Sequence, residues 1–329
     1  MTLALSVDGL SVWYGEERAV HSVALEVPVG KVLALIGETG SGKSSVALAA
    51  ARLLPPRARM EGRVLVAGEE MSALSGAQLR RLRGEKVGFV TQDALAGLNP
   101  VMRVGRQIAE VFQFHRNLNR RESAARAVES IEQVRIPEPA AVARLYPHQL
   151  SGGMRQRIMI AIALALRPPV VIADEPTTAL DVSTQADILR LVRELCAELG
   201  TGILWITHDM GVVAEVADLV AVMYAGRIVE HGHAASVFDR QQHPYTRALL
   251  RTLHDMRAGQ PGDPLFQIEG QPPSLNTVIT GCPFHPRCPM ATSLCATEEP
   301  VSQRFGGLEG TESGLVACHH LGDQAGAMT

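Results

Sequence analysis

One stretch constrains the fold more than any other, Gly37-Glu38-Thr39-Gly40-Ser41-Gly42-Lys43-Ser44, which fits the P-loop pattern GxxxxGK[ST]. An apolar run at 32–36 precedes it and an Ala-rich run that begins near Ser44 follows, so we expect a strand, a loop and a helix. The glycines let the backbone turn its N–H groups inward around phosphates. Lys43 would reach the β- and γ-phosphates and the Ser44 hydroxyl would ligate Mg²⁺, which indicates an α/β fold that binds a nucleoside triphosphate.

A second apolar run, 170–173, ends in the paired carboxylates Asp174 and Glu175. The run predicts a buried parallel strand, and its C-terminal end is where doubly wound sheets bind ligands. Asp174 would orient Mg²⁺, and Glu175 would polarise water against the γ-phosphate. The alternative is a solvated strand end that caps the next helix. The turn residues Pro176-Thr177-Thr178 disfavour that alternative.

A second anion site is predicted at Leu150-Ser151-Gly152-Gly153, which leads into the helical stretch MRQRIMIAIALAL. Unpaired backbone N–H groups and the dipole of this helix would meet there. The chain already has a P-loop, so this second site indicates an active site shared between chains.

These three motifs, at 37–44, 150–153 and 173–181 (ADEPTTALD), occur in the order seen in ATP-binding cassette (ABC) ATPases, and the chain resembles that family. The resemblance implies two cassettes that dimerise head to tail. Ser151 and Gly153 of one chain would then contact the γ-phosphate held by Lys43 of the other.

The resemblance also implies roles for four residues outside the phosphate loops. Gln92, after the short apolar strand that contains Phe89 and Val90, matches a glutamine that senses Mg²⁺ and the attacking water and whose loop touches membrane subunits. His208, after the apolar run 203–207, matches a histidine that bonds the γ-phosphate, and Tyr14 matches the aromatic that stacks on adenine. Asp181 closes a loop that crosses the dimer interface, although a helix N-cap would look the same. For Gln92, His208 and Tyr14 the ordinary alternatives are a surface glutamine, a satisfied polar histidine and a packed aromatic.

The predicted site therefore has three sets of residues. The catalytic set is Glu175, His208 and Gln92, with Ser44 and Gln92 as Mg²⁺ ligands. The nucleotide-contacting set is Tyr14, Gly37, Glu38, Thr39, Gly40, Ser41, Gly42, Lys43, Ser44, Ser45, Asp174, Ser151, Gly152, Gly153 and Asp181.

Length and charge limit the remaining function classes. The 329 residues exceed one cassette, which suggests an α/β domain with an appendage. The net charge is −3 with both signs interspersed, so there is no basic field for nucleic-acid binding. The longest uncharged apolar stretch, 158–166, is too short to span a bilayer and the N-terminus lacks a signal segment, so we expect a cytoplasmic chain.

Pattern changes along the chain divide it into two predicted domains, a nucleotide-binding domain at 1–240 and a C-terminal extension at 241–329. Within the first, alternating residues up to about residue 30 predict an antiparallel β subdomain that pairs with 62–67. The stretch from about 95 to 160 predicts an inserted helical subdomain. Prolines from Pro244 onward predict that no long helix forms in the extension.

Four of the five cysteines lie in the extension: Cys282, Cys288, Cys295 and Cys318. Disulfides are disfavoured in a cytosolic chain. Zinc sites usually show a Cys-x₂₋₄-Cys pair, which is absent here, whereas iron–sulfur clusters accept irregular spacing. The chemistry leaves a cluster, a zinc site with help from His285, His319 or His320, and free thiols all open. The fifth cysteine, Cys196, has apolar helical neighbours and is predicted to be a buried structural thiol.

The extension resembles that of oligopeptide and dipeptide importer ATPases, through His243-Pro244-Tyr245-Thr246-Arg247-Ala248-Leu249-Leu250 and the four cysteines. This resemblance implies a [4Fe–4S] cluster on those cysteines, a paralogous ATPase partner, two integral membrane permease subunits and an extracytoplasmic substrate-binding protein. It places the chain at the cytoplasmic face of the inner membrane. Nickel or another small solute is an alternative cargo. A soluble cassette ATPase that acts on ribosomes or DNA is a further alternative, although such chains normally fuse two cassettes or insert long coiled coils.

Overall fold

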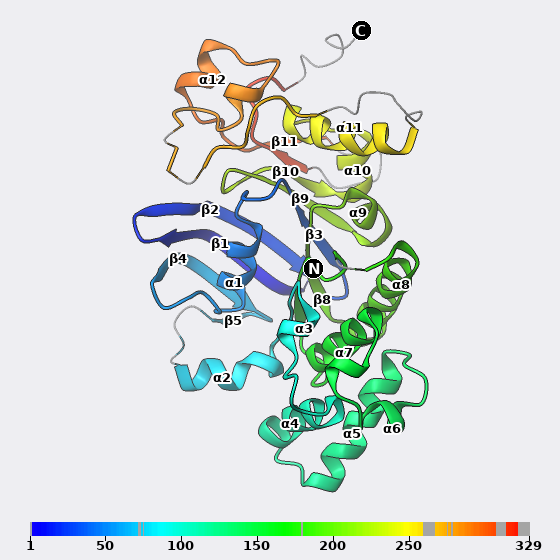
Figure 1. Cartoon of the computed structure of the whole chain (residues 1–329). Helices are drawn as coiled ribbons and strands as arrows, with labels where there is room; N and C mark the ends of the chain where they lie inside the picture. Colours follow the sequence, from blue (N-terminus) through cyan, green and yellow to red (C-terminus); the bar gives the residue numbers. More distant parts are fainter. Residues whose placement is uncertain are drawn as a thin grey trace.

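Two β-sheets organise the computed structural model of the chain (Figure 1). The larger sheet has the strand order β11-β12-β10-β9-β3-β8-β7-β6 and the smaller has the order β2-β1-β4-β5. The structure describes residues 2–71, 74, 76–178, 180–258, 267–274, 276–277, 279–306 and 314–321, with the backbone alone for 253–258.

The parallel part of the larger sheet forms the centre of the molecule. β3 (Val32–Ile36) lies between β8 (Gly202–Thr207) and β9 (Leu219–Tyr224), and β7 (Val170–Asp174) and β6 (Val87–Val90) follow on the β8 side. The strands β3 and β8 are buried at every position, because side chains of both faces are covered. The strands expected from the apolar runs before the P-loop, before the carboxylates and before His208 are confirmed.

The smaller sheet is antiparallel, as the alternating pattern predicted. β1 (Leu3–Tyr14) pairs with β2 (Glu17–Pro28) on one side and with β4 (Ala58–Val66) on the other, and β5 (Glu69–Glu70) adds a short edge. The helix α1 (Lys43–Ala50) contacts strands of both sheets. Its Val46, Ala47, Ala49 and Ala50 share one apolar core with residues of β1, β2 and β3. This packing fixes the P-loop, which precedes α1, between the two sheets.

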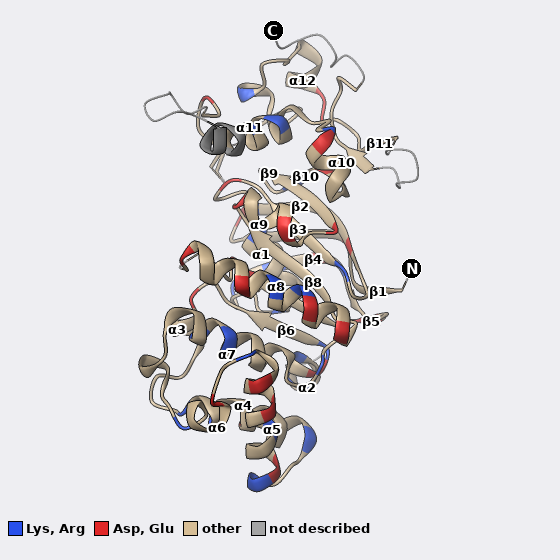
Figure 2. Cartoon of the chain, turned by 90° about the vertical axis from the view of Figure 1, so that its right-hand side faces the viewer, with Lys and Arg blue, Asp and Glu red and all other residues tan. Residues whose placement is uncertain are grey.

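Helices connect β6 to β7 and lie at the end of the molecule opposite the C-terminal extension (Figure 1). α5 (Arg120–Gln133) begins with a capping box in which the Asn119 side chain accepts hydrogen bonds from the first turn and the Glu122 side chain accepts from the Asn119 N–H. Figure 2 shows Lys and Arg interspersed with Asp and Glu along α5 and along α8 (Val182–Leu199). α2 (Gly76–Glu85) precedes β6 in the sequence. The helices that connect β6 to β7 are α3 (Ala94–Gly97), α4 (Val104–Arg116), α5 (Arg120–Gln133), α6 (Pro139–Val142), the 3₁₀ turn η1 (Pro147–Gln149) and α7 (Gly152–Leu164).

Between β7 and β9 the chain also forms α8 (Val182–Leu199) and α9 (Met210–Val216). Cys196 on α8 is 2% exposed and its thiol donates to the Thr201 carbonyl at 2.8 Å. Burial raises the pKa of the Cys196 thiol to about 12, so the predicted buried structural thiol is confirmed. In the described ranges, no helix combines the length and the apolar character that crossing a membrane requires.

The C-terminal extension continues the larger sheet. After β10 (Arg227–His233) and α10 (Ala234–Asp239), the chain returns through β12 (Gly314–Val316), which pairs antiparallel with both β10 and β11 (Gln303–Phe305). Further extension elements are α11 (Pro244–Ala258), the 3₁₀ turn η2 (His285–Arg287) and α12 (Ser293–Thr297).

The prediction that prolines prevent a long helix in the extension is wrong for α11, which has 15 residues. Pro244 is the first residue of that helix. At this position its missing N–H would have no partner within the helix, and its fixed φ suits the first turn.

The predicted α/β core, with an antiparallel sheet and an inserted set of helices, is confirmed.

Candidate functional site

The P-loop encloses its own lysine. A Cβ atom on Gly37, whose φ is 151°, would lie 2.1 Å from the Met223 carbonyl oxygen, so only glycine fits against β9 there. Lys43 is 5% exposed, and its Nζ donates to the carbonyl oxygens of Gly37 at 2.8 Å and Glu38 at 2.9 Å. Burial lowers the pKa of Lys43, although the carboxylates of Glu175, Asp174 and Glu38 act in the opposite direction.

The other residues of the predicted nucleotide set surround this lysine. Thr39 and Gly40 are exposed and Ser41 is buried, with Gly42 as the N-cap of α1 at φ 102°. Tyr14 is half-buried, and its hydroxyl donates to the Ser45 Oγ at 3.1 Å. The predicted adenine-stacking residue therefore lies beside the first turn of α1, next to the phosphate loop.

The two carboxylates diverge at the end of β7. The Asp174 Oδ1 accepts a hydrogen bond from the Ser44 Oγ at 3.2 Å, and burial is the main cause of the raised pKa of Asp174. Glu175 has a φ of 46°, a left-handed conformation that is rare for a side chain of this kind. Its N–H donates to the Ile206 carbonyl at 2.9 Å, which stabilises this conformation.

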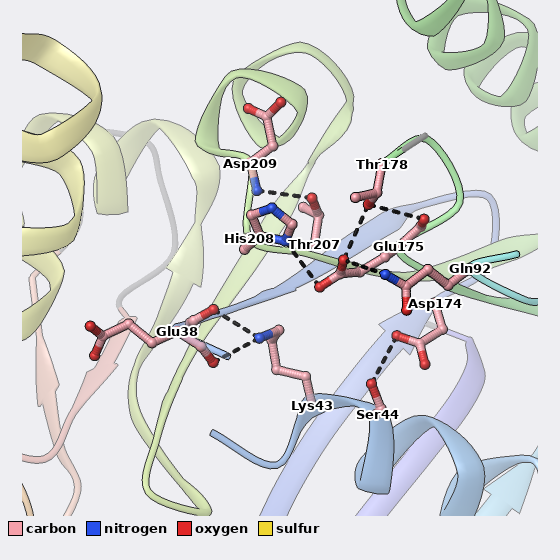
Figure 3. Close-up of polar contacts among 11 residues, drawn as sticks. Glu38, Lys43, Ser44, Gln92, Asp174, Glu175, Thr178, Thr207, His208 and Asp209 are labelled. Carbon is pink, nitrogen blue, oxygen red and sulfur yellow. Dashed lines mark hydrogen bonds and ion pairs between the residues drawn. The ribbon is translucent and has the colours of Figure 1, made fainter. Parts of the chain in front are cut away.

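Three polar side chains contact the Glu175 carboxylate (Figure 3). Gln92 Nε2 donates to Oε2 at 3.2 Å, and His208 Nδ1 lies 3.0 Å from Oε1. Thr178 Oγ1 donates to Oε2 at 3.1 Å. Gln92, Glu175 and His208 follow β6, β7 and β8, so the parallel sheet brings all three predicted catalytic residues to one edge. The sequence prediction missed Thr178, whose only signal was its place three residues after Glu175.

This edge can support hydrolysis of a phosphoanhydride. The oxygen atoms of Ser44, Asp174 and Gln92 are hard ligands of the kind that Mg²⁺ binds. The Glu175 carboxylate, 16% exposed, can accept a proton from a water molecule at the solvent side. Lys43 and the P-loop N–H groups supply positive charge for the phosphates.

The stretch Ser151-Gly152-Gly153 forms a different surface. Ser151 is the N-cap of α7, where its Oγ accepts from the Met154 N–H at 3.2 Å. A Cβ atom on Gly153 would lie 2.5 Å from the Thr184 Cγ2. Asp181 is the N-cap of α8 and accepts from the Thr184 N–H at 3.0 Å. The start of α7 therefore lies against the start of α8, and the helix-cap alternative for Asp181 is observed.

The four cysteines of the extension gather in one region. Cys282, Cys295 and Cys318 are buried and Cys288 is half-buried, and the Cys282 N–H donates to the Cys295 carbonyl at 2.8 Å. Burial raises the pKa of Cys282, Cys288 and Cys318, that of Cys288 to about 11, and nearby thiols add to the shifts.

The geometry of these thiols does not support the predicted metal site. In the part of the chain that the structure describes, no three side chains of His, Cys, Asp or Glu form a group that could hold a metal ion. The alternative ligands have other contacts, since His285 Nδ1 lies 2.9 Å from the Cys282 carbonyl oxygen and His319 Nε2 lies 2.9 Å from the Glu298 carbonyl oxygen. His320 Nε2 lies 3.4 Å from the Cys295 Sγ.

Two residues of the extension reach the P-loop, and the sequence prediction missed both contacts. The Tyr245 hydroxyl accepts from the Glu38 N–H at 2.8 Å, and Arg287 Nη1 donates to Glu38 Oε2 at 2.7 Å. Arg287 is 249 positions from Glu38, so no local pattern signals the pair.

Comparison with known proteins agrees with this geometry. The ABC transporter family matches residues 20–178, and the C-terminal region of the oligopeptide/dipeptide transporter family matches residues 229–295. The probable peptide ABC transporter ATP-binding protein y4tR of Sinorhizobium fredii is 47% identical over 294 residues, 88% of each chain. The dipeptide transport ATP-binding protein DppD of Escherichia coli is 42% identical over 330 residues, 99% of each chain. The oligopeptide transport ATP-binding protein OppD of Escherichia coli is 43% identical and covers 88% of this chain and 85% of its own length.

Solved structures show the same cassette. CbiO1 from Clostridium perfringens, part of an ABC transporter complex, has a TM-score of 0.64 at 27% identity and covers 78% of this chain and 96% of its own. A dimeric ATP-binding cassette in a post-hydrolysis state with ADP and phosphate has a TM-score of 0.61 at 28% identity, covering 70% and 98%. The chain is therefore an ABC ATPase and belongs to the oligopeptide/dipeptide family of ABC transporter ATP-binding proteins.

Proposed function

We propose that this chain is the ATP-hydrolysing subunit of a binding-protein-dependent importer for oligopeptides or dipeptides. The observation that carries the proposal is the contact of Glu175 with Gln92 and His208 at the sheet edge that also holds Lys43 and Ser44. The relatives named as oligopeptide and dipeptide transport proteins, and the match of residues 229–295 to the C-terminal region of such transporters, support the peptide cargo.

Each residue of this edge has a role in the proposed reaction. Ser44, Asp174 and Gln92 would hold Mg²⁺, and the bound ion would supply positive charge against the negative charge that develops on the phosphates. The Lys43 ammonium has three N–H donors, and Gly37 and Glu38 take two of them, so one is left for a phosphate oxygen. Glu175 accepts a proton from the attacking water, and His208 orients that carboxylate and bonds the γ-phosphate.

The site is completed by a second ATPase chain, for which we propose a paralogue. Ser151, Gly152 and Gly153 then face the nucleotide held by the P-loop of the partner, and Asp181 lies at the interface. A helix start that carries free N–H groups and a favourable dipole suits a terminal phosphate. The cassette relative that was solved as a dimer supports this arrangement.

We further propose that two integral membrane permease subunits and an extracytoplasmic substrate-binding protein complete the importer. The chain would be peripheral, at the cytoplasmic face of the inner membrane, and the Gln92 loop would transmit closure of the cassettes to the permeases. The domain division at about residue 240, with the helical subdomain at about 95–160, belongs to the same proposal.

Reconstituted transport tests the function. The chain is purified with its membrane partners, inserted into vesicles with the binding protein, and supplied with ATP and labelled di- to pentapeptides or with nickel ions. The proposal expects peptide uptake that depends on ATP and stops in Glu175→Gln. Uptake of nickel without peptide uptake would assign a different cargo, and co-purification with ribosomes instead of membrane proteins would reject the importer.

For the extension we propose that Cys282, Cys288, Cys295 and Cys318 bind a [4Fe–4S] cluster. Four thiols gathered in one buried region are the donor set that such clusters use, although the side chains do not form a single-ion site. Anaerobic purification followed by iron and sulfide quantification tests this proposal. About four irons per chain, lost in Cys288→Ser and retained in Cys196→Ser, would support it. Zinc without sulfide, or no metal at all, would contradict it.

A further inference from the structure

Glu38, the second residue of the P-loop, has a partner at each of its polar groups. Its carboxylate accepts from Arg287 Nη1 at 2.7 Å and from Arg287 Nη2 at 3.1 Å, and its N–H donates to the Tyr245 hydroxyl at 2.8 Å. Its carbonyl oxygen accepts from Lys43 Nζ at 2.9 Å and from the Ser41 N–H at 3.2 Å. Figure 3 shows the carbonyl facing the Lys43 ammonium while the side chain extends away from it.

Contacts other than those with Glu38 also hold the Arg287 side chain in place. Its side chain is 4% exposed, Nε donates to the Glu269 carbonyl at 2.9 Å, and Nη2 also donates to the Ile268 carbonyl at 3.3 Å. Nη1 lies 3.4 Å from the Tyr224 hydroxyl. The planar guanidinium bonds the carboxylate through two nitrogens and bonds backbone carbonyls through its other N–H groups. These contacts restrict both the position and the orientation of the side chain.

Tyr245 is fixed by packing. It is fully buried on α11, and its ring centroid lies 4.7 Å from that of Tyr224 and 5.3 Å from that of Phe284. Tyr224 belongs to β9, whose Met223 carbonyl lies against Gly37. The aromatic cluster therefore joins α11, the segment that contains Phe284 and the strand beneath the P-loop into one packed unit.

We propose that Arg287 and Tyr245 are positioning residues for ATP binding. Together they hold the Glu38 peptide so that its carbonyl orients Lys43 and the P-loop N–H groups face the phosphates. Arg287 also neutralises a carboxylate that belongs to the phosphate-binding loop itself, and without it the carboxylate would repel the triphosphate. The extension thus acts on nucleotide affinity, in addition to its attachment to the sheet through β12.

Nucleotide affinity of the full-length chain tests this proposal. Binding of a non-hydrolysable ATP analogue with Mg²⁺ is measured for the wild type, Arg287→Ala, Arg287→Lys and Glu299→Gln. Glu299 is the matched control, because its ion pair with Arg227 also joins extension to core, at 2.5 Å, but does not contact the P-loop. We expect Kd to rise about tenfold in Arg287→Ala and about threefold in Arg287→Lys, with less than about a twofold change in the control.

Two further readouts separate positioning from general stability. We expect kcat at saturating ATP to stay within about twofold of the wild type in Arg287→Ala, because the chemistry at Glu175 is untouched while KM rises. The double variant Arg287→Ala/Glu38→Gln removes the unpaired charge, so it should bind the analogue more tightly than Arg287→Ala alone.

Three results would overturn the proposal: wild-type affinity in Arg287→Ala, an equal loss of affinity in Glu299→Gln, or no recovery in the double variant. Thermal unfolding of each variant shows whether the chain is folded. If Arg287→Ala does not fold, Arg287→Lys and Arg287→Lys/Glu38→Gln provide the same comparison.

Discussion

The P-loop and the start of α7, the two surfaces that we propose to contact phosphate, differ in how complete they are. At the P-loop, Lys43, Ser44 and the carboxylates of Asp174 and Glu175 are joined by hydrogen bonds to each other or to their neighbours within one chain. At the start of α7, Ser151 caps its own helix and Gly153 lies against Thr184. The contrast fits our proposal that folding alone assembles the P-loop half of the site, whereas the start of α7 is a surface presented to another ATPase chain.

The largest effect is expected at the complete surface, in Glu175→Gln. The amide keeps the shape of the side chain and its contacts with Gln92 and Thr178, but it cannot accept a proton from water. We expect ATP turnover to fall by at least about 100-fold while the affinity for ATP stays within about twofold. Steady-state phosphate release and equilibrium binding measure the two quantities. Near-normal turnover would remove Glu175 from the role of base and weaken the contrast between the surfaces.

A smaller effect is expected at the presented surface, in Ser151→Ala. We propose that the Ser151 hydroxyl bonds a phosphate oxygen in the transition state, so its loss should lower kcat about tenfold and leave binding of ATP at Lys43 unchanged. Because Ser151 is also an N-cap, Asn119→Ala on α5 serves as the control for loss of a cap. If Asn119→Ala lowers kcat as much, the effect of Ser151 is structural and the presented surface has no catalytic part.

The smallest effect concerns pH, and it should arise at the P-loop alone. Burial lowers the pKa of Lys43, so its ammonium loses the proton at a lower pH than an exposed lysine does. We expect the affinity for ATP to weaken several-fold as the pH rises from about 7 toward the ordinary pKa of lysine, about 10.4, because the positive charge opposite the phosphates is lost below that pKa. Lys43→Arg should bind more weakly at neutral pH but remove this dependence, whereas Ser151→Ala should keep it. A flat profile in the wild type would contradict the assignment.

Most of the catalytic edge was predictable from the sequence, for a physical reason. Gln92, Glu175 and His208 each follow an apolar run, and parallel strands place their C-terminal ends at one edge of the sheet. The P-loop could also be predicted from its glycines and Lys43, because the conformation of the loop depends on residues that are neighbours in the chain. The contact of His208 with Glu175 needed the strand order as well, since these residues are 33 positions apart.

The extension was less predictable, because its contacts depend on long-range packing. Composition indicated prolines and cysteines but not that α11 begins at Pro244 or that Tyr245 is buried beneath the P-loop. The resemblance of the extension to importer ATPases implied a [4Fe–4S] cluster on the four cysteines, yet the described side chains do not form a metal site. Arg287 and Glu38 form an ion pair although they lie 249 positions apart, so no local sequence pattern predicts this contact.

The central claim, that this chain offers Ser151 to the ATP of another chain, is tested most directly by vanadate trapping. A complex is prepared in which the chain carries Ser151→Arg and the second ATPase chain differs in size, and it is incubated with vanadate and a radiolabelled photoreactive ATP analogue. Each trapped nucleotide then labels the chain whose P-loop holds it. The account predicts that label disappears from the second ATPase chain and remains on this one. Loss of label from this chain, with label retained on the second, would contradict it.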